Sequence, residues 1–234
     1  FTQVDKFLLS GLMPLDEYGG FIITANLAAI IFMAVSPLSQ AIFPELSRAY
    51  FKGDEVEFDR LYTWSVKLVV LLLTCVAFSL ALNASEVLEI WTGGAILDTS
   101  LEDVFVILCI ASVFNGVSWI PQQAQFALGE TTSTIKINIS LFLMLLCSLP
   151  ITYTKFGIKG CVLSVLVANI IFAACFLRST KAHLTKTRFQ KFLKDTIILP
   201  SLVSLFLVIC FRQAFLSVDF PALLELSISG ALTL

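Results

Sequence analysis

The longest stretch of this chain without a charged residue lies near its start. The 27 residues from 18 to 44 contain no Asp, Glu, Lys or Arg, and Glu17 and Glu45 bound them. As a helix this stretch would be about 40 Å long, enough to cross the roughly 30 Å hydrocarbon core of a bilayer. It therefore predicts a membrane-spanning helix.

This stretch nevertheless carries polar groups and a proline at membrane depth. They are Asn26, Ser36, Pro37, Ser39 and Gln40. Such residues are tolerated inside a membrane mainly where a helix faces other helices or a water-filled cavity. The pattern is typical of a transporter helix.

The composition extends this interpretation to the whole chain. Hydrophobic residues make up 58% and charged residues 14%, whereas a soluble domain carries about 25% charge. The chain therefore cannot present an ordinary water-facing surface, and we predict an integral membrane protein. Its six cysteines form no CxxC pair and are accompanied by a single histidine, His183, so we expect neither a metal site nor a cofactor.

Repeated apolar intervals predict an all-α, polytopic bundle of transmembrane helices. The expected spans are the exit half of a helix in 1–15, then 19–44, 68–85, 104–129, 137–154, 160–177, 196–211, and the start of another in 220–234. Gly53-Asp54 and residues 154–160 (TKFGIKG) are expected to be turns. Because Phe1 and Leu234 both lie in such intervals, we expect a fragment of a longer protein.

The distribution of basic residues predicts the orientation of these spans. Residues 178–195 carry six Lys and Arg, and their only acid is Asp195 at the end, whereas 86–103 carry five acids and no base. By the positive-inside rule the first segment is cytoplasmic and the second is outside. Because successive spans alternate in direction, segments 45–67 and 130–136 are then also inside, and segments 155–159 and 212–219 are outside. The basic segment is also expected to meet anionic lipid.

The interval 104–129 combines apolar length with a polar end. Asn115, Ser118 and Gln122 share one face of a helix at spacings i, i+3 and i+7, and Pro121 is expected to kink or open that helix. Each buried amide needs a partner in a bilayer, so this face is expected to point inward. Two roles remain open for it, namely hydrogen bonding between helices and lining a substrate path.

Three classes of function are compatible with a polytopic membrane protein. A transporter needs kinked, polar-lined helices, which the second and fourth spans supply. A membrane-embedded enzyme of polysaccharide assembly would need an arranged catalytic set, and the acidic outer segment offers none. A purely structural protein has no use for such polar groups at depth. The sequence contains no phosphate-binding glycine loop of the kind that would indicate an ATP-driven pump.

Two segments of the sequence resemble a known family. They are residues 3–21 (QVDKFLLSGLMPLDEYGGF) and 35–54 (VSPLSQAIFPELSRAYFKGD), with Gln3-x-Asp5-Lys6, Tyr18-Gly19, and Phe43-Pro44 followed by Leu46-Ser47 as the specific parts. In their order and spacing they resemble the bacterial flippases that export O-antigen and other lipid-linked oligosaccharides, within the multidrug/oligosaccharidyl-lipid/polysaccharide exporter superfamily. The resemblance extends to about Arg178.

The resemblance implies a transporter of two six-helix lobes around a cavity that opens alternately to each side. Residues 1–178 would form the second lobe, 179–195 a basic cytoplasmic loop, and 196–234 extra C-terminal helices. The implied activity is not enzymatic: it is translocation of an undecaprenyl-diphosphate-linked oligosaccharide across the bacterial inner membrane. Implied partners are this substrate, membrane lipids, a coupling H⁺ or Na⁺, and other polysaccharide-assembly proteins, with no nucleic acid.

Within this scheme, specific residues are assigned candidate roles. Lys6 is the candidate cation for the diphosphate, Asp5 the candidate for ion coupling, and Arg48 a candidate gate at the inner mouth. The candidate sugar contacts are Gln3, Gln40, Asn115, Gln122 and Gln125. The alternative is an ion-coupled drug or organic-cation antiporter of the same superfamily, which would favour an acidic, aromatic cavity. A membrane-embedded polysaccharide-assembly enzyme ranks third.

Overall fold

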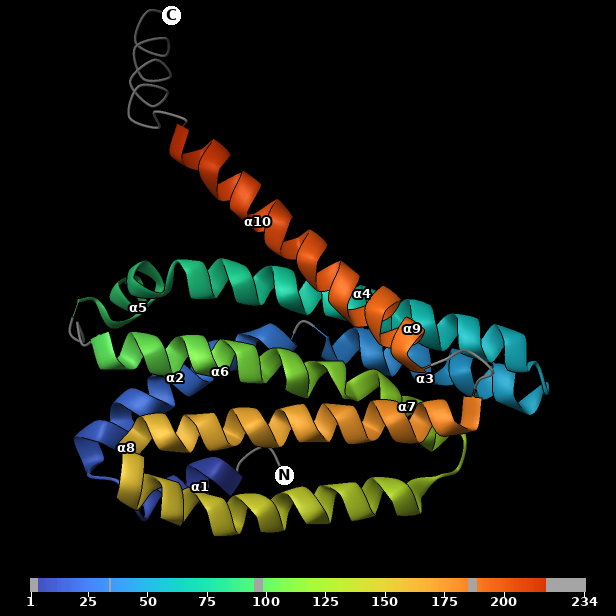
Figure 1. Ribbon diagram of the computed structural model, residues 1–234, viewed down its shortest axis with the longest axis horizontal. Coiled ribbons are helices and arrows are strands. Elements are labelled where there is room, and N and C mark those ends of the chain that lie inside the picture. The colour runs from blue at the N-terminus through green and yellow to red at the C-terminus, as the bar shows by residue number, and fades with distance from the viewer. Residues whose placement is uncertain (1–3, 34, 95–98, 185–188, 218–234) are drawn as a thin grey trace, which may run out of the picture.

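The computed structural model describes residues 4–33, 35–94, 99–184 and 189–217, and all regular structure within these ranges is helical (Figure 1). The helices are α1 Val4–Ser10, α2 Leu15–Met33, α3 Ser36–Phe51, α4 Glu55–Leu82, α5 Ala84–Thr92, α6 Thr99–Val117, α7 Trp119–Ala127, α8 Thr131–Leu184, α9 Phe189–Leu193, η1 Lys194–Ile198 (a single π-helical turn) and α10 Leu199–Ser217. The expected all-helical class is confirmed for this part of the chain.

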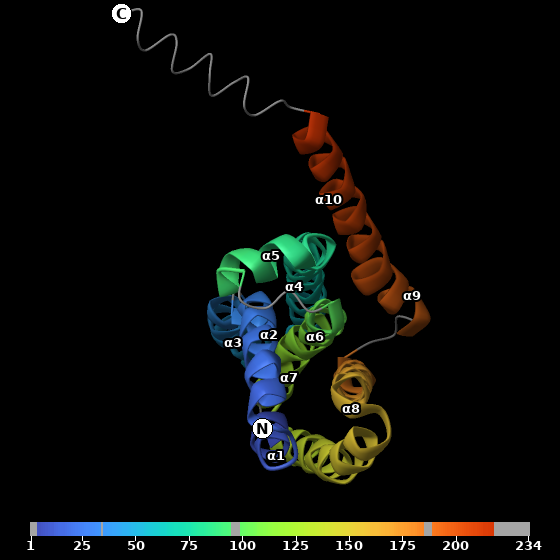
Figure 2. The ribbon, with the colours of Figure 1, turned by 90° about the vertical axis from the view of Figure 1, so that its left-hand side faces the viewer.

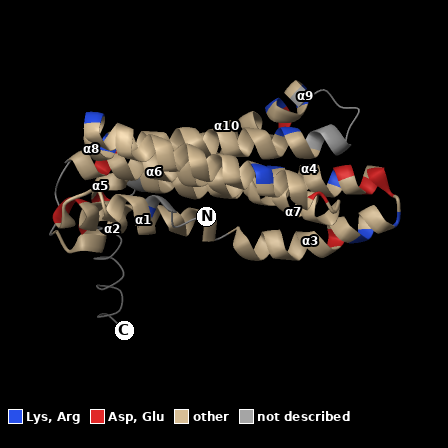
Figure 3. Ribbon diagram, turned by 90° about the horizontal axis from the view of Figure 1, so that it is seen from below, with Lys and Arg blue, Asp and Glu red and all other residues tan. Residues whose placement is uncertain are grey.

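Five helical stretches are long and apolar enough to span a membrane. They are Leu15–Phe51, Glu55–Leu82, Ser100–Ala127, Thr131–Thr180 and Gln190–Gln213. Lys, Arg, Asp and Glu mostly gather at the two ends of the long axis, with the uncharged part of the bundle between them (Figure 3). This separation is what a bilayer requires of a bundle that crosses it.

Two of these stretches are interrupted near a proline. Between α2 and α3, the Val35 amide bonds the carbonyl of Phe32 at 3.0 Å, and Pro37 lies at the start of α3. Between α6 and α7 the break falls at Ser118, three residues before Pro121. A proline has no N–H for the carbonyl four residues earlier, so each helix loses a backbone bond where it breaks. The predicted opening at Pro121 is therefore confirmed.

The stretch Thr131–Thr180 is folded back on itself. A straight helix of 50 residues would be about 75 Å long, more than twice the hydrocarbon core. At Gly157 the backbone takes φ 61° and ψ −152°, a conformation that only glycine adopts readily. The two arms on either side run antiparallel (Figures 1 and 2). This confirms the expected turn between the fifth and sixth spans.

Several segments expected to be loops are helical. The helix that contains the span 68–85 begins at Glu55, where Asp54 caps it by accepting a bond from the Glu57 amide, so the turn at Gly53-Asp54 is confirmed and is short. The predicted outer loop 86–103 contains α5, whose Leu88 is buried, and a left-handed Gly93 ends it. The predicted basic loop 179–195 is helical up to Leu184 and again from Phe189. The predicted span 220–234 lies outside the described residues.

Helix α6 lies at the centre of the packing, against α2, α4 and both arms of α8 (Figure 2). It packs closely on α4 at Gly116, where a Cβ would lie 2.7 Å from a methyl carbon of Leu73. Small residues allow such close contacts between membrane helices, where packing and hydrogen bonds rather than water drive association. Helix α10 crosses α4 and then leaves the bundle towards its C-terminal end (Figures 1 and 2).

Candidate functional site

A cavity of about 230 Å³ lies inside the bundle, between α1, α2, α6 and both arms of α8. Small side chains on α2 and α6 leave the space, among them Ala25, Ala28 and Ala111. Its polar lining residues are Lys6, Ser112, Asn115 and Asn169. The cavity therefore combines one cation with amides and a hydroxyl inside a membrane-spanning bundle.

Lys6 connects this cavity with the outer face of α2. Its Nζ donates a hydrogen bond of 2.7 Å to Oδ1 of Asn26, which is exposed near the middle of α2. The hydroxyl of Tyr18 donates to the Lys6 carbonyl at 3.2 Å and so anchors α1 on α2. Lys6 as a residue is half-buried, and the partner seen for its ammonium is a neutral amide. Its positive charge thus stays available to an anion.

The two asparagines hold α6 and α8 together across the cavity. Asn115 Nδ2 donates to Oδ1 of Asn169 at 3.0 Å, and Asn169 Nδ2 donates to the Val165 carbonyl at 2.9 Å. Trp119 Nε1 donates to Oδ1 of Asn115 at 3.3 Å. The amides form a connected chain, as buried polar groups in a membrane require.

The cavity adjoins both helix breaks. Phe32, the penultimate residue of α2, lines the cavity and lies with its ring centroid 6.0 Å from that of Trp119, the first residue of α7. Ser118, at the second break, donates to the Asn115 carbonyl. The polar groups of the cavity therefore lie next to the two breaks in the spanning helices. A change in the angle at either break would alter the cavity.

The polar groups of this cavity are of the kinds that bind an anion and hydroxyl groups. A lysine ammonium attracts phosphate as a point charge, and amides can both donate to and accept from sugar hydroxyls. In the described residues no cluster of three His, Cys, Asp or Glu side chains is placed to hold a metal ion. The volume is also below the range of about 300–1,000 Å³ usual for pockets that enclose a small molecule.

Among the predicted site residues, the structure brings Lys6 and Asn115 to this one cavity. Gln125 lies elsewhere and is fully buried. Its Oε1 accepts from Thr134 Oγ1 at 2.7 Å, and its Nε2 donates to Thr180 Oγ1 at 3.4 Å. The amide thus links α7 to both arms of α8, which is the hydrogen-bonding role left open for these polar residues.

The other predicted residues are spread over α3, α7 and the N-terminus. Gln40 is exposed on α3 and bonds Ser36 Oγ at 3.3 Å, whereas Gln122 is half-buried on α7. Arg48 forms an exposed surface bridge of 3.0 Å with Glu45, a contact of the kind that contributes little to stability. Gln3 lies outside the described residues, and so does the side chain of Asp5.

Three residues of the site were not among the predicted ones, namely Asn26, Ser112 and Asn169. Asn26 and Asn169 are each a lone amide inside an apolar span, and a lone polar residue at membrane depth is the signal that identifies them. The partner of each one, the Lys6 ammonium for Asn26 and the Asn115 amide for Asn169, lies 20 or 54 positions away in the sequence.

Comparison of the chain with protein-family models, with curated proteins and with solved structures finds no match. Membrane character therefore rests on the length and composition of the helices, and function on the chemistry of the site. The helices and side chains behind these two conclusions belong to the part of the chain that the structure describes.

Proposed function

We propose that this chain is one lobe of a bacterial inner-membrane transporter that moves an undecaprenyl-diphosphate-linked oligosaccharide from the inner to the outer leaflet. The single observation that carries the proposal is Lys6, a half-buried cation on a cavity within the spanning helices, with a neutral amide as its visible partner. Charged residues are costly at membrane depth and usually mark a substrate or ion path.

The chemistry of the site favours an anionic substrate with hydroxyl groups. A diphosphate would pair with the Lys6 ammonium, and sugar hydroxyls would exchange hydrogen bonds with Asn26 on α2 and with Gln40 on α3. Both amides are exposed, so they present polar surface where a lipid-facing helix would present hydrocarbon. The cavity itself is too small for an oligosaccharide, so the sugars would lie along this exposed face and the lipid tail would stay in the bilayer.

The two adjoining helix breaks support a conformational mechanism for the transport step. Discontinuous helices near the middle of the membrane are a recurring device of secondary transporters, which rock one half against the other around a fixed site. Here the breaks at Val35 and Ser118 lie next to the candidate site. Coupling to H⁺ or Na⁺ through Asp5, and gating by Arg48, remain parts of the same proposal.

The same cation disfavours the antiporter alternative. An organic cation would be repelled by Lys6, and no acidic side chain is among the described residues that line the cavity. We therefore place the anionic, lipid-linked substrate first.

The test is a flipping assay on the complete protein reconstituted in proteoliposomes. Replacing Lys6 by Gln removes a charge-assisted contact of about 1.5–3 kcal/mol, which corresponds to a roughly ten- to hundredfold loss of apparent affinity for the lipid-linked diphosphate. Lys6→Arg is expected to retain most of the activity, and Lys52→Gln, at the exposed turn before α4, to retain all of it. Unchanged flipping in Lys6→Gln would contradict the assignment, and drug export without flipping would favour the antiporter.

A further inference from the structure

A second, larger cavity lies on the other side of α6. The Lys6 cavity uses Leu108, Ala111, Ser112 and Asn115 of that helix, whereas this one uses Ile110, Val113, Phe114 and Val117. The two sets are offset by two residues, which is about 200° around an α-helix. They therefore face in nearly opposite directions, and the second cavity is a separate site.

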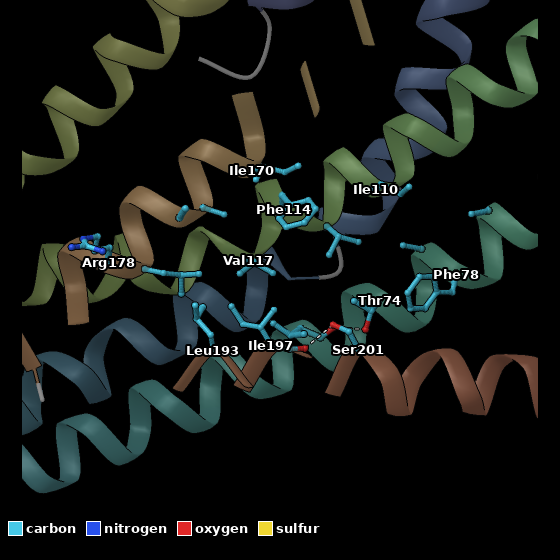
Figure 4. A pocket seen from close by; sticks show the side chains of 17 residues that line it. Thr74, Phe78, Ile110, Phe114, Val117, Ile170, Arg178, Leu193, Ile197 and Ser201 are labelled. Carbon is cyan, nitrogen blue, oxygen red and sulfur yellow. Dashed lines mark hydrogen bonds between the residues drawn. The ribbon is translucent and has the colours of Figure 1, made fainter. Parts of the chain in front are cut away.

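The second cavity, of about 490 Å³, is a groove between α4, α6, the second arm of α8, and the segment from α9 to α10. Figure 4 shows Phe114 and Val117 of α6 facing Ile197 of η1, with Thr74 of α4 and Ser201 of α10 below them. We call it the α10 groove. Its walls come from helices far apart in the sequence, and the α9–η1–α10 segment forms one whole side.

The α10 groove offers almost no hydrogen-bonding capacity to a ligand. Thr74 Oγ1 donates to the Val70 carbonyl at 2.6 Å and accepts from Ser204 at 2.7 Å. Ser201 donates to the Ile197 carbonyl at 2.7 Å. These hydroxyls are therefore used within the protein, and apart from Arg178 at one end the other lining side chains are hydrocarbon. An apolar cavity of this kind does not hold water.

The groove is open on the side of the bundle that α10 leaves uncovered. Ile110 and Ile170, which line it, are each 40% exposed. In a membrane these residues meet the hydrocarbon of the bilayer, so a lipid chain can enter sideways. Because water is excluded, a hydrocarbon chain is the natural occupant.

One end of the groove is positively charged. Arg178, the last of its lining residues along α8, is exposed at the end of the apolar walls (Figure 4). Lys191 and Lys194 are exposed on the facing segment, next to the lining residue Leu193. Asp195 is the acid on that segment, and none of the ion pairs formed by described side chains involves Arg178. By the positive-inside rule this end is cytoplasmic.

We propose that the α10 groove is a binding site for one anionic glycerophospholipid of the cytoplasmic leaflet. One acyl chain lies along Phe114, Val117 and Ile197, and the phosphate contacts the Arg178 guanidinium, with Lys194 adding positive potential. Guanidinium binds the lipid phosphate through parallel hydrogen bonds. The surrounding positive charge of Lys191 and Lys194 disfavours a headgroup that carries its own ammonium, while the apolar walls accept any chain. This proposal is independent of the transported substrate.

The test is native mass spectrometry of the complete chain, delipidated in mild detergent and incubated with equal amounts of phosphatidylglycerol and phosphatidylethanolamine of identical acyl chains. Wild-type protein is expected to favour phosphatidylglycerol at least fivefold. In Arg178→Gln the ratio of bound phosphatidylglycerol to bound phosphatidylethanolamine falls towards one. In Ala174→Trp, which places an indole in the mouth of the groove, binding of both lipids falls. Lys136→Gln, which removes an exposed charge near the start of α8, on the other arm of the hairpin from Arg178, leaves the preference unchanged.

A second measurement separates loss of binding from loss of folding. A phosphatidylglycerol with a photoreactive acyl chain is expected to label residues 110–117 of α6 in the wild type and in Lys136→Gln. Equal binding of the two headgroups by wild-type protein would overturn the proposal, as would labelling confined to other helices. Recovery of a polyprenyl phosphate in place of phospholipid would also overturn it, because the groove would then belong to the substrate.

Discussion

Replacing Gln125 by methionine tests whether its buried amide holds three helical segments together. Methionine has nearly the same length and volume as glutamine, so the substitution removes hydrogen bonds and leaves the packing almost unchanged. Gln125, Thr134 and Thr180 are all at most 5% exposed, so no water is available to replace the lost partners.

The expected loss of stability follows from the individual bonds. The bond from Thr134 is short at 2.7 Å, whereas the bond to Thr180 is long at 3.4 Å and contributes little. Thr180 also keeps its bond to the Pro121 carbonyl at 3.2 Å. One good interhelical bond is therefore lost, worth about 0.6–1.7 kcal/mol in a membrane protein, and the orphaned Thr134 hydroxyl adds to that. We expect a loss of about 1–2 kcal/mol.

The chain carries its own reporters of unfolding. Cys109 and Cys161 are fully buried, whereas Cys147, Cys175 and Cys210 are exposed and can be blocked beforehand with a maleimide. The reaction of the two buried thiols with a fluorogenic reagent then follows unfolding in detergent. For a chain of 234 residues, 1–2 kcal/mol corresponds to a fall in Tm of about 2–8 °C.

Gln122→Met is the matched control, because Gln122 lies on the same helix but is only half-buried. Its Tm should stay close to that of the wild type, within the roughly 0.5 kcal/mol usual for such sites. Thr134→Val should destabilise as Gln125→Met does, and the double variant should lose little more than either single one. If Gln125→Met had the same Tm as Gln122→Met, the inference that the Gln125 amide stabilises the bundle through Thr134 and Thr180 would be wrong.

Three further predictions concern glycines and the cavity amides. Gly157→Ala should cost about 1–3 kcal/mol because of the backbone conformation at the reversal, whereas Gly19→Ala, within α2, should be neutral or slightly stabilising by the same thiol assay. Gly116→Val should cost about 1–3 kcal/mol by overpacking against Leu73, and a Tm equal to that of the wild type would show that α4 and α6 are not in close contact. Asn169→Leu should cost about 0.6–1.7 kcal/mol and leave its partner amide on α6 without an acceptor; an unchanged Tm would mean that the pair contributes nothing.

Much of the helical organisation could be predicted because it depends on local properties of the sequence. The absence of charge in 18–44 identified a span, and Pro121 identified the interruption between α6 and α7. The reversal at Gly157 was predicted because it lies in a short polar turn between two apolar runs. Helix α5 was missed because only Ala84 and Leu88, four residues apart, are buried in it, and a single such pair is too short a pattern to recognise.

The site was harder to predict because it depends on contacts between distant residues. The spacing of Asn115, Ser118 and Gln122 assumed one continuous helix, and the break at Ser118 ends that periodicity. Gln125 was assigned to the substrate by residue type alone, although its surroundings are supplied by two threonines on α8. Lys6 does line a cavity, but its role as the cation for a substrate stays a prediction.

The reversal at Gly157 also bears on how the chain enters a membrane during synthesis. The two arms of α8 are separated by so few residues that neither can be inserted while the other is still outside, and we expect them to cross as one helical hairpin. In the predicted orientation, the tip of this hairpin, which carries Lys159, crosses the hydrocarbon. In the folded protein the Lys159 ammonium pairs with the carboxylate of Asp103, at the start of α6, with 2.7 Å between Nζ and Oδ2. We therefore expect α6 to be inserted before the hairpin and to pack against both arms as soon as they enter the membrane.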